Sequence, residues 1–194
     1  MASRRPKRKC RLQTSEKYSP LTKALGSGRD QEGFEVRYIN GYIGHGVFAS
    51  QKFNTGDFLL EYKGDLVSRK EGERREAQYT PTKGSFLMFF SYDGKRLCMD
   101  GTEDPFDTNM ARMINDEGEN PNCVMRAISF LGRPRLCLFA LKDINIGEEL
   151  RYDYGVEDLP WRLESKRKSL RRNSSLDELT FCGLNKETTK SWWM

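Results

Sequence analysis

The chain has 194 residues, which is enough for one domain with its own buried core and shorter tails. No apolar run reaches the roughly 18 residues of a membrane-spanning helix, so we expect an intracellular protein without a membrane span. Its five scattered cysteines form no CxxC pair, and its one histidine, His45, cannot build an HExxH site. The composition therefore predicts neither a disulfide framework nor a bound metal.

Charge divides the chain into three parts. Residues 1–37 carry 10 Lys or Arg and 4 Asp or Glu, residues 161–194 carry 8 and 4, and residues 38–160 carry 15 and 20. An acidic body attracts a basic partner, whereas a basic tail can lie along nucleic acid. We expect a basic, largely flexible arm over residues 1–33, which directs nuclear import and contacts nucleosomal DNA. A solvated tail without a specific role is the alternative.

Between the tails the pattern changes to short strands. Alternating or apolar runs predict strands at 34–39, 58–62, 86–92, 96–99, 124–130 and 135–141. Asp93-Gly94 predicts one hairpin turn, and the LGRP stretch at 131–134 predicts another. A helix is predicted at 68–79, with a capping box and a weakening Gly72. The result is a mostly β (α+β) domain over 34–163, followed by a polar, Ser/Arg-rich flexible tail at 164–194.

Four short motifs carry the groups that could do chemistry. They are Gly44-x-Gly46, the strand end EYKGD at 61–65, the polar stretch RMINDEGENPNCV at 112–124, and GEELRYDYG at 147–155. Each has a plain explanation as a tight turn, a surface turn or core packing of tyrosines on one strand face. A calcium loop is excluded for the polar stretch, because its glycine spacing would place Met113 and Val124 at ligand positions. Taken singly, none of the four identifies a function.

Taken together, the motifs resemble the SET-domain protein lysine methyltransferases in order and spacing. The matching residues are Gly44, Gly46, Glu61, Tyr62, Gly64, Asp65, Arg112, Ile114, Asn115, Pro121, Asn122, Cys123, Glu149, Leu150, Tyr152, Asp153, Tyr154 and Gly155. Within this family the chain is most similar to the histone H4 lysine monomethyltransferases, through EGFEVRYING and GDFLLEYKGDLVS. The short segment LPWRLE stands where many SET enzymes carry a cysteine-rich zinc segment.

The resemblance implies a SET fold, with several short-stranded sheets around a knot-like crossing and few short helices. The Asn-rich stretch 112–124 would form this crossing, and its amides would satisfy backbone groups that leave the sheets. The resemblance also implies S-adenosylmethionine as the cofactor, with Trp161 stacked on its adenine and no metal site. The implied cofactor-binding residues are Ile43, Gly44, His45, Gly46, Phe86, Asn115, Asp116 and Trp161.

The implied reaction transfers a methyl group to a lysine of a histone, H4-like, or of another basic protein. The lysine amine must be neutral, although its free pKa is about 10.4. Burial in an aromatic channel lowers that pKa, so tyrosines suit the channel wall. The resemblance implies that Tyr154 is the main catalytic residue, that Tyr62 and Tyr152 line the channel, and that Tyr152 restricts the product to one methyl. We expect a nuclear, chromosome-associated enzyme.

Asp116 departs from the family pattern, which usually has histidine after the asparagine. A buried carboxylate needs a partner, which His45 or an arginine such as Arg112 could supply. This change keeps a second hypothesis open, in which a SET domain with weak or no catalysis binds a basic peptide or chromatin. A third hypothesis, a basic nucleic-acid-binding protein, depends on the tails alone and conflicts with the acidic body.

Overall fold

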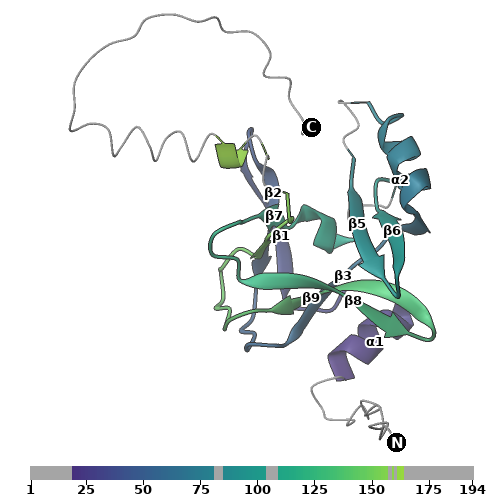
Figure 1. The fold of residues 1–194 in the computed structure, drawn as a ribbon. Coiled ribbons are helices and arrows are strands. Elements are labelled where there is room, and N and C mark those ends of the chain that lie inside the picture. Colours follow the sequence, from purple (N-terminus) through teal and green to yellow (C-terminus); the bar gives the residue numbers. More distant parts are fainter. Residues whose placement is uncertain (1–18, 81–84, 104–108, 157–158, 160, 164–194) are drawn as a thin grey trace, which may run out of the picture.

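A computed structural model describes residues 19–80, 85–103, 109–156, 159 and 161–163. The described residues form ten strands in three small sheets, with short helices at their margins (Figure 1). This is the mostly β architecture that the sequence predicts, and several sheets meet around one core instead of closing into a barrel.

The three sheets differ in size and pairing. The first is a two-stranded hairpin, and the second has five strands in the order β3-β9-β8-β10-β7. The third has three strands in the order β4-β6-β5. The strands are β1 (Phe34–Asn40), β2 (Gly44–Ala49), β3 (Phe58–Tyr62), β4 (Asp65–Ser68), β5 (Leu87–Tyr92), β6 (Lys95–Asp100), β7 (Asn115–Asp116), β8 (Cys123–Phe130), β9 (Arg133–Ala140) and β10 (Arg151–Tyr152).

Both predicted hairpins form. Asp93 and Gly94, with φ of 49° and 72°, join β5 to β6, and two consecutive positive φ values are typical of a type I′ turn. Leu131 and Gly132, with φ of 49° and 77°, join β8 to β9 in the same way. The second turn is shorter than the predicted LGRP stretch, because Pro134 lies within β9 opposite Ser129.

The predicted helix is α2 (Arg69–Glu76), which begins after its N-cap residue Ser68 and is shorter than the predicted range. The Ser68 hydroxyl accepts a hydrogen bond from the Glu71 N–H at 3.2 Å, as a capping box requires. Gly72 is buried in this helix, and a Cβ there would lie 2.7 Å from the Cβ of Cys98. Glycine therefore lets α2 pack closely on β6, although it lowers helix propensity.

Residues 19–27 depart from the expectation of a flexible arm. They form α1 (Ser19–Ser27), which lies beside the five-stranded sheet (Figure 1). Ala24 and Leu25 of this helix are buried in a cluster with Phe58 of β3 and Cys137 of β9. The apolar side chains of this short helix thus cover a sheet face that water would otherwise reach. The rest of the predicted arm, residues 1–18, and the predicted tail, 164–194, lie outside the described residues.

The crossing lies where β10 enters the five-stranded sheet. Strand β10 runs parallel to both β7 and β8 and lies between them, although β7 and β8 are consecutive in the chain. The later segment therefore crosses the loop at 117–122. Asn122, which is 7% exposed, donates from its amide to the Glu149 carbonyl at 2.8 Å and accepts from the Arg151 N–H at 2.8 Å. The prediction that buried amides serve this crossing is confirmed.

Candidate active site

Three tyrosine side chains gather beside the crossing. Tyr62 ends β3, Tyr152 ends β10, and Tyr154 follows two residues later. The ring centroids of Tyr152 and Tyr154 are 4.7 Å apart, so the two rings lie together as predicted, although Tyr154 is outside the strand. The Tyr62 hydroxyl donates to the Phe86 carbonyl at 2.8 Å, and the Tyr154 hydroxyl donates to the Ile114 carbonyl at 2.7 Å. Backbone carbonyls thus orient two of the three phenols.

Burial keeps these phenols neutral. Tyr62 and Tyr152 are 4% and 3% exposed. Removal from water raises the pKa of all three tyrosines above the ordinary value of 10, and the nearby Asp116 carboxylate raises the pKa of Tyr154 further. A neutral phenol donates a hydrogen bond and presents an apolar ring face, but it does not act as a base near neutral pH. The cluster can therefore orient an amine and exclude water from it.

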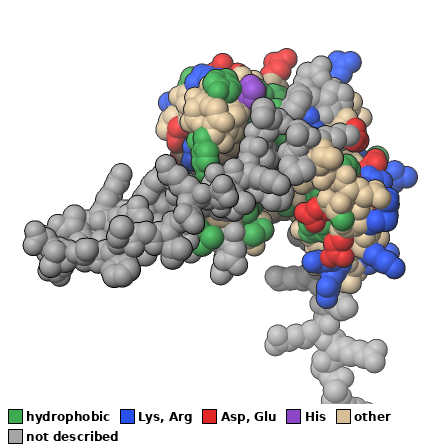
Figure 2. Space-filling view, turned by 90° about the horizontal axis from the view of Figure 1, so that it is seen from above, with side chains coloured by type: hydrophobic (Ala, Val, Ile, Leu, Met, Phe, Trp, Pro, Cys, Tyr) green, Lys and Arg blue, Asp and Glu red, His purple; other side chains and the backbone are tan. Residues whose placement is uncertain are grey.

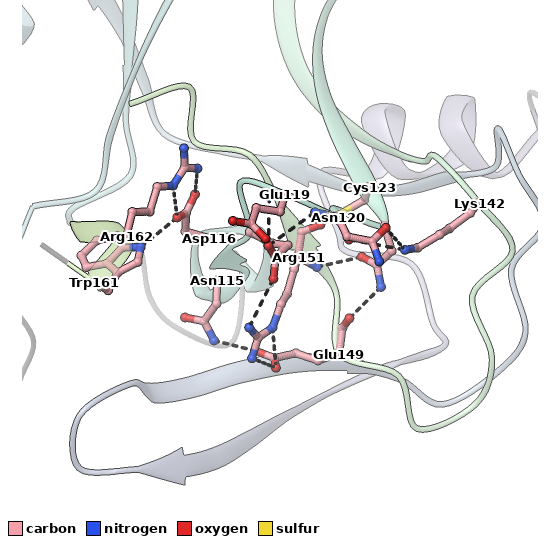
Figure 3. A network of polar contacts seen from close by, with 12 residues as sticks. Asn115, Asp116, Glu119, Asn120, Cys123, Lys142, Glu149, Arg151, Trp161 and Arg162 are labelled. Carbon is pink, nitrogen blue, oxygen red and sulfur yellow. Dashed lines mark hydrogen bonds and ion pairs between the residues drawn. The ribbon is translucent and has the colours of Figure 1, made fainter. Parts of the chain in front are cut away.

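The start of β2 and the amide of Asn115 form a second part of the site. Gly44 has φ of 79°, and among the described residues no atom lies within 4 Å of the place where a Cβ would stand. At Gly46, by contrast, a Cβ would lie 2.7 Å from Glu149 Oε1 and 3.0 Å from Asn115 Nδ2. Asn115 Nδ2 donates to the His45 carbonyl at 3.1 Å. It also donates to Glu149 Oε1 at 2.7 Å (Figure 3). These contacts use both amide hydrogens, which leaves the Asn115 Oδ1 oxygen for a ligand.

Ile43 and His45 flank Gly44 at the turn between β1 and β2. The Ile43 N–H donates to the Asn40 side-chain oxygen at 2.9 Å, which fixes the turn locally. The exposed His45 ring packs edge-on against Tyr38, with ring centroids 5.5 Å apart. These contacts assign no chemical role to either side chain. The expected contact of Ile43 and His45 with a cofactor through their backbone groups stays a prediction.

Asp116 joins β7 to the C-terminal end of the described chain. Its side chain is 4% exposed. Its Oδ1 accepts the Tyr154 N–H at 3.1 Å, and its Oδ2 accepts Trp161 Nε1 at 2.8 Å and Arg162 Nε at 2.7 Å. A second guanidinium nitrogen of Arg162 bonds to Oδ1, so the pair is bidentate (Figure 3). One carboxylate therefore ties together three residues from the end of the domain.

The partner of Asp116 is thus Arg162 and neither of the two residues that the sequence suggested. Arg112 donates to the carbonyls of residues 101 and 102, and the backbone carbonyl of His45 receives the Asn115 amide. Arg162 is 46 residues away from Asp116 in the chain and belongs to none of the four motifs. The only sequence signal was its position next to Trp161, so its role depends on the tertiary fold.

Trp161 and Phe86 lie on two sides of the tyrosine cluster. The Trp161 ring is perpendicular to the Tyr154 ring, at 6.4 Å between centroids. The Phe86 carbonyl receives the Tyr62 hydroxyl, and its ring lies 4.7 Å from the Arg112 guanidinium carbon. Both residues therefore border the tyrosines, while stacking of Trp161 on adenine and contact of Phe86 with the cofactor stay predictions.

Within the described ranges, no group of three or more His, Cys, Asp or Glu side chains could hold a metal ion. In the same part of the chain, no helix is long and apolar enough to cross a membrane.

Comparisons with known proteins agree with this geometry. N-lysine methyltransferase KMT5A-A of Danio rerio is 36% identical over 166 residues, which are 81% of this chain and 47% of that protein. Histone-lysine N-methyltransferase Set8 of Drosophila melanogaster is 36% identical over 126 residues, which are 64% of this chain and 18% of that protein. This chain therefore spans less than half the length of these relatives.

Two solved structures are similar in fold. CpSET8 from Cryptosporidium is 29% identical with a TM-score of 0.62, covering 75% of this chain and 68% of that chain. The autoinhibited ctPRC2 bound to S-adenosylmethionine is 26% identical with a TM-score of 0.52, covering 74% of this chain and 17% of that chain. The family model described as SET domain matches residues 44–155, which include the β2 glycines, the crossing and the tyrosine cluster. The chain therefore belongs to the SET domain family.

Proposed function

We propose that this protein is an S-adenosylmethionine-dependent protein-lysine N-methyltransferase, which adds one methyl group to a lysine of a histone, H4-like, or of another basic protein. The observation that carries the proposal is the cluster of Tyr62, Tyr152 and Tyr154. Its phenols are neutral, Tyr62 and Tyr152 are buried, and backbone carbonyls fix the hydroxyls of Tyr62 and Tyr154. Relatives named as lysine methyltransferases support the same conclusion.

The residues around Gly44 fit the cofactor. The methionine part of S-adenosylmethionine needs backbone and amide groups that it can approach closely. Among the described residues, Gly44 has open space beside its backbone. The Asn115 Oδ1 oxygen is an acceptor at the adjacent position, and Trp161 provides an aromatic surface next to Tyr154. When bound, S-adenosylmethionine supplies a methyl group activated by a positively charged sulfur.

The tyrosine cluster would prepare the lysine amine for attack. Burial disfavours the charged ammonium form, so the cluster lowers the amine pKa and exposes its lone pair. The phenols orient the nitrogen, and their rings exclude water and tolerate a cationic methylated product. Since no covalent intermediate with the protein is needed, positioning of the two reactants supplies much of the acceleration.

Calorimetric titration with S-adenosylmethionine, followed by transfer assays on nucleosomes and free histones, tests this function. We expect cofactor binding and a mass increase of one methyl per modified lysine. Absence of both would remove the proposal. Binding without transfer would favour a second function, a SET domain that holds a basic peptide, and the carboxylate at Asp116 is the observation that favours this alternative.

The predicted partners follow from charge. The acidic body at 38–160 suits a lysine-rich substrate, and the arm at 3–11 holds six basic residues and no acid. We propose that the arm contacts nucleosomal DNA and directs the protein to the nucleus and to chromosomes. Deleting residues 3–11 should weaken nucleosome binding and reduce its salt dependence. An unchanged salt dependence would show that the arm makes no phosphate contacts.

A further inference from the structure

The Asp116 carboxylate uses its hydrogen-bonding capacity on groups of its own chain. A carboxylate offers about four acceptor sites on its two oxygens. Oδ1 accepts from the Tyr154 N–H. Arg162 donates to both oxygens and Trp161 donates to Oδ2 (Figure 3). With the side chain 4% exposed, these four donors fill the sites. The Asp116 side chain is therefore placed to hold protein groups, and a ligand would find no oxygen left over.

Two of the groups that Asp116 holds belong to the proposed active site. The Tyr154 backbone is fixed at 3.1 Å from Asp116 Oδ1, while its hydroxyl is fixed at 2.7 Å from the Ile114 carbonyl. The indole nitrogen of Trp161 is fixed at 2.8 Å from Oδ2, and its ring stands edge-on to the Tyr154 ring. A shift of Asp116 would therefore move both rings relative to Tyr62 and Tyr152.

Arg162 completes the arrangement from the other side. Its guanidinium bonds to Asp116 in bidentate fashion and to Asp153 Oδ1 at 2.6 Å. It lies directly over Gly118, where a Cβ would be 2.8 Å from the guanidinium carbon. Glycine at this position leaves room for the ion pair. Arg162 therefore contacts two separate parts of the chain, residues 116–118 and Asp153, at the same time.

We propose that Asp116 and Arg162 form a positioning pair, which holds residues 161–163 against β7 and β10 and thereby sets Tyr154 and Trp161 for methyl transfer. The proposal rests on the proposed function. Asp116 acts through these two residues and is not itself assigned to the reacting atoms. The carboxylate that replaces the family histidine thus has a defined partner from outside the family motifs.

Removing one member of a buried ion pair leaves the other charge without compensation. Asp116→Asn and Arg162→Met should therefore each disturb the site, and the double variant should be no worse than the more damaged single variant. Gly118→Ala keeps both charges but displaces the guanidinium, so it should cause a smaller change in the same direction.

The first experiment follows Trp161 without any assay of activity. The chain has three tryptophans, and replacing the other two by Trp192→Phe and Trp193→Phe leaves fluorescence from Trp161 alone. In this background, Asp116→Asn and Arg162→Met should raise acrylamide quenching of Trp161 severalfold, because the indole loses its fixed contact. Unchanged quenching would overturn the proposal, whether or not the protein transfers methyl groups.

The second experiment separates positioning from stability. Glu61 supplies a matched control, because its carboxylate is also 4% exposed and pairs with an arginine, Arg135. Glu61 precedes Tyr62 on β3, so its side chain points to the opposite face of the strand. Glu61→Gln should lower the melting temperature and leave kcat of the folded protein little changed. Asp116→Asn should lower kcat of the folded protein by about tenfold or more, as small misplacements of reacting groups do.

Equal loss of kcat in Asp116→Asn and Glu61→Gln at similar stability would overturn the positioning role. So would strictly additive effects of Asp116→Asn and Arg162→Met on kcat or on quenching. If the wild-type protein neither binds the cofactor nor transfers methyl groups, the proposed function fails, and the fluorescence experiment still decides whether the pair holds Trp161.

Discussion

Tyr154 is held at both ends by one short segment of chain. Its N–H meets the Asp116 carboxylate and its hydroxyl meets the Ile114 carbonyl, so residues 114–116 fix both the backbone and the ring. Burial and the Asp116 charge keep the phenol protonated by raising its pKa. A phenol that is neutral and held in place near neutral pH is better suited to orienting an amine than to removing a proton from it.

Replacing Tyr154 by phenylalanine should reduce methyl transfer by about a hundredfold, because it removes a hydroxyl oxygen that the Ile114 carbonyl holds in place to accept a hydrogen bond from the amine. Cofactor affinity should change little, because Gly44 and Asn115 are unaffected. Steady-state kinetics on a histone H4 peptide, together with calorimetric titration of the cofactor, checks both parts. Unchanged turnover would remove Tyr154 from its catalytic role.

Tyr152→Phe should allow a second methyl to be added. Loss of the hydroxyl removes a polar group from the wall of the channel and frees space beside the amine, while the ring keeps its contact with Tyr154. Mass spectrometry of the product after long incubation measures the distribution of methyl states. A product that stays entirely monomethylated would count against a role of Tyr152 in limiting the reaction.

Short elements, held by side chains, carry this site. Strands β7 and β10 have two residues each, and the Asn122 side chain bonds to the Arg151 N–H of β10 and to the Glu149 carbonyl just before it. Helix α2 shows the same dependence on close packing, since Gly72 lets it approach Cys98 and Phe89. Helix α1 contains Gly26, and no atom of the described part of the chain lies within 4 Å of the position that a Cβ would take there.

The two helical glycines should respond in opposite ways to alanine. Gly72→Ala gains about 1 kcal/mol of helix propensity but overpacks a buried contact at a cost of about 1–3 kcal/mol, so we expect a net loss of about 1 kcal/mol. Gly26→Ala, its matched control, should stabilise the fold by about 0.5–1 kcal/mol because the space is open. Urea unfolding measures both changes, and stabilisation by Gly72→Ala would mean that α2 and β6 are not tightly packed.

The whole molecule brings its three sheets together around the tyrosine cluster. Tyr62 comes from the five-stranded sheet, Phe86 directly precedes β5 of the three-stranded sheet, and Gly44 begins β2 of the hairpin. Lys and Arg side chains gather on the side that carries α2 and the β5–β6 hairpin, as the view from above shows (Figure 2). Burial of Tyr62 and Tyr152 at this junction raises their pKa values, so the free energy of unfolding should depend on pH in the alkaline range.

The stability of the whole fold should fall above about pH 10. In the unfolded chain a tyrosine has a pKa of about 10, whereas burial raises the pKa of Tyr62 and Tyr152 in the folded protein. A folded pKa above the unfolded one gives stability that is complete below pH 10 and is lost as pH rises towards the folded pKa. Each phenol should remove up to about 1.4 kcal/mol per pH unit in this range.

Urea unfolding of the wild type and of Tyr152→Phe, at pH 8 and at pH 10.5, measures this dependence. The variant should lose less stability between the two pH values, because it lacks one of the phenols that ionise on unfolding. Equal losses would show that Tyr152 is not desolvated in the folded protein. Other groups that titrate in this range are common to both proteins and cancel in the comparison.

Local signals in the sequence were sufficient for the hairpins, the N-cap of α2 and the family motifs. The Asp93-Gly94 turn follows from the backbone preferences of these two residues, and the Ser68 hydroxyl caps α2 through an N–H only three residues further along the chain. The order of the four motifs also identified the tyrosines and the crossing, because these residues recur in the family at similar spacing.

Long-range contacts decided the rest. Helix α1 has apolar residues at helical spacing, but nine residues are too few for a helix to be stable alone, and it is held because Ala24 and Leu25 are buried against the sheet. Arg162 became the partner of Asp116 only because the chain end returns to β7 across 46 residues, and no local pattern encodes that return. Pairing of a buried charge depends on which groups the fold brings within hydrogen-bond distance, so only the tertiary structure could assign it.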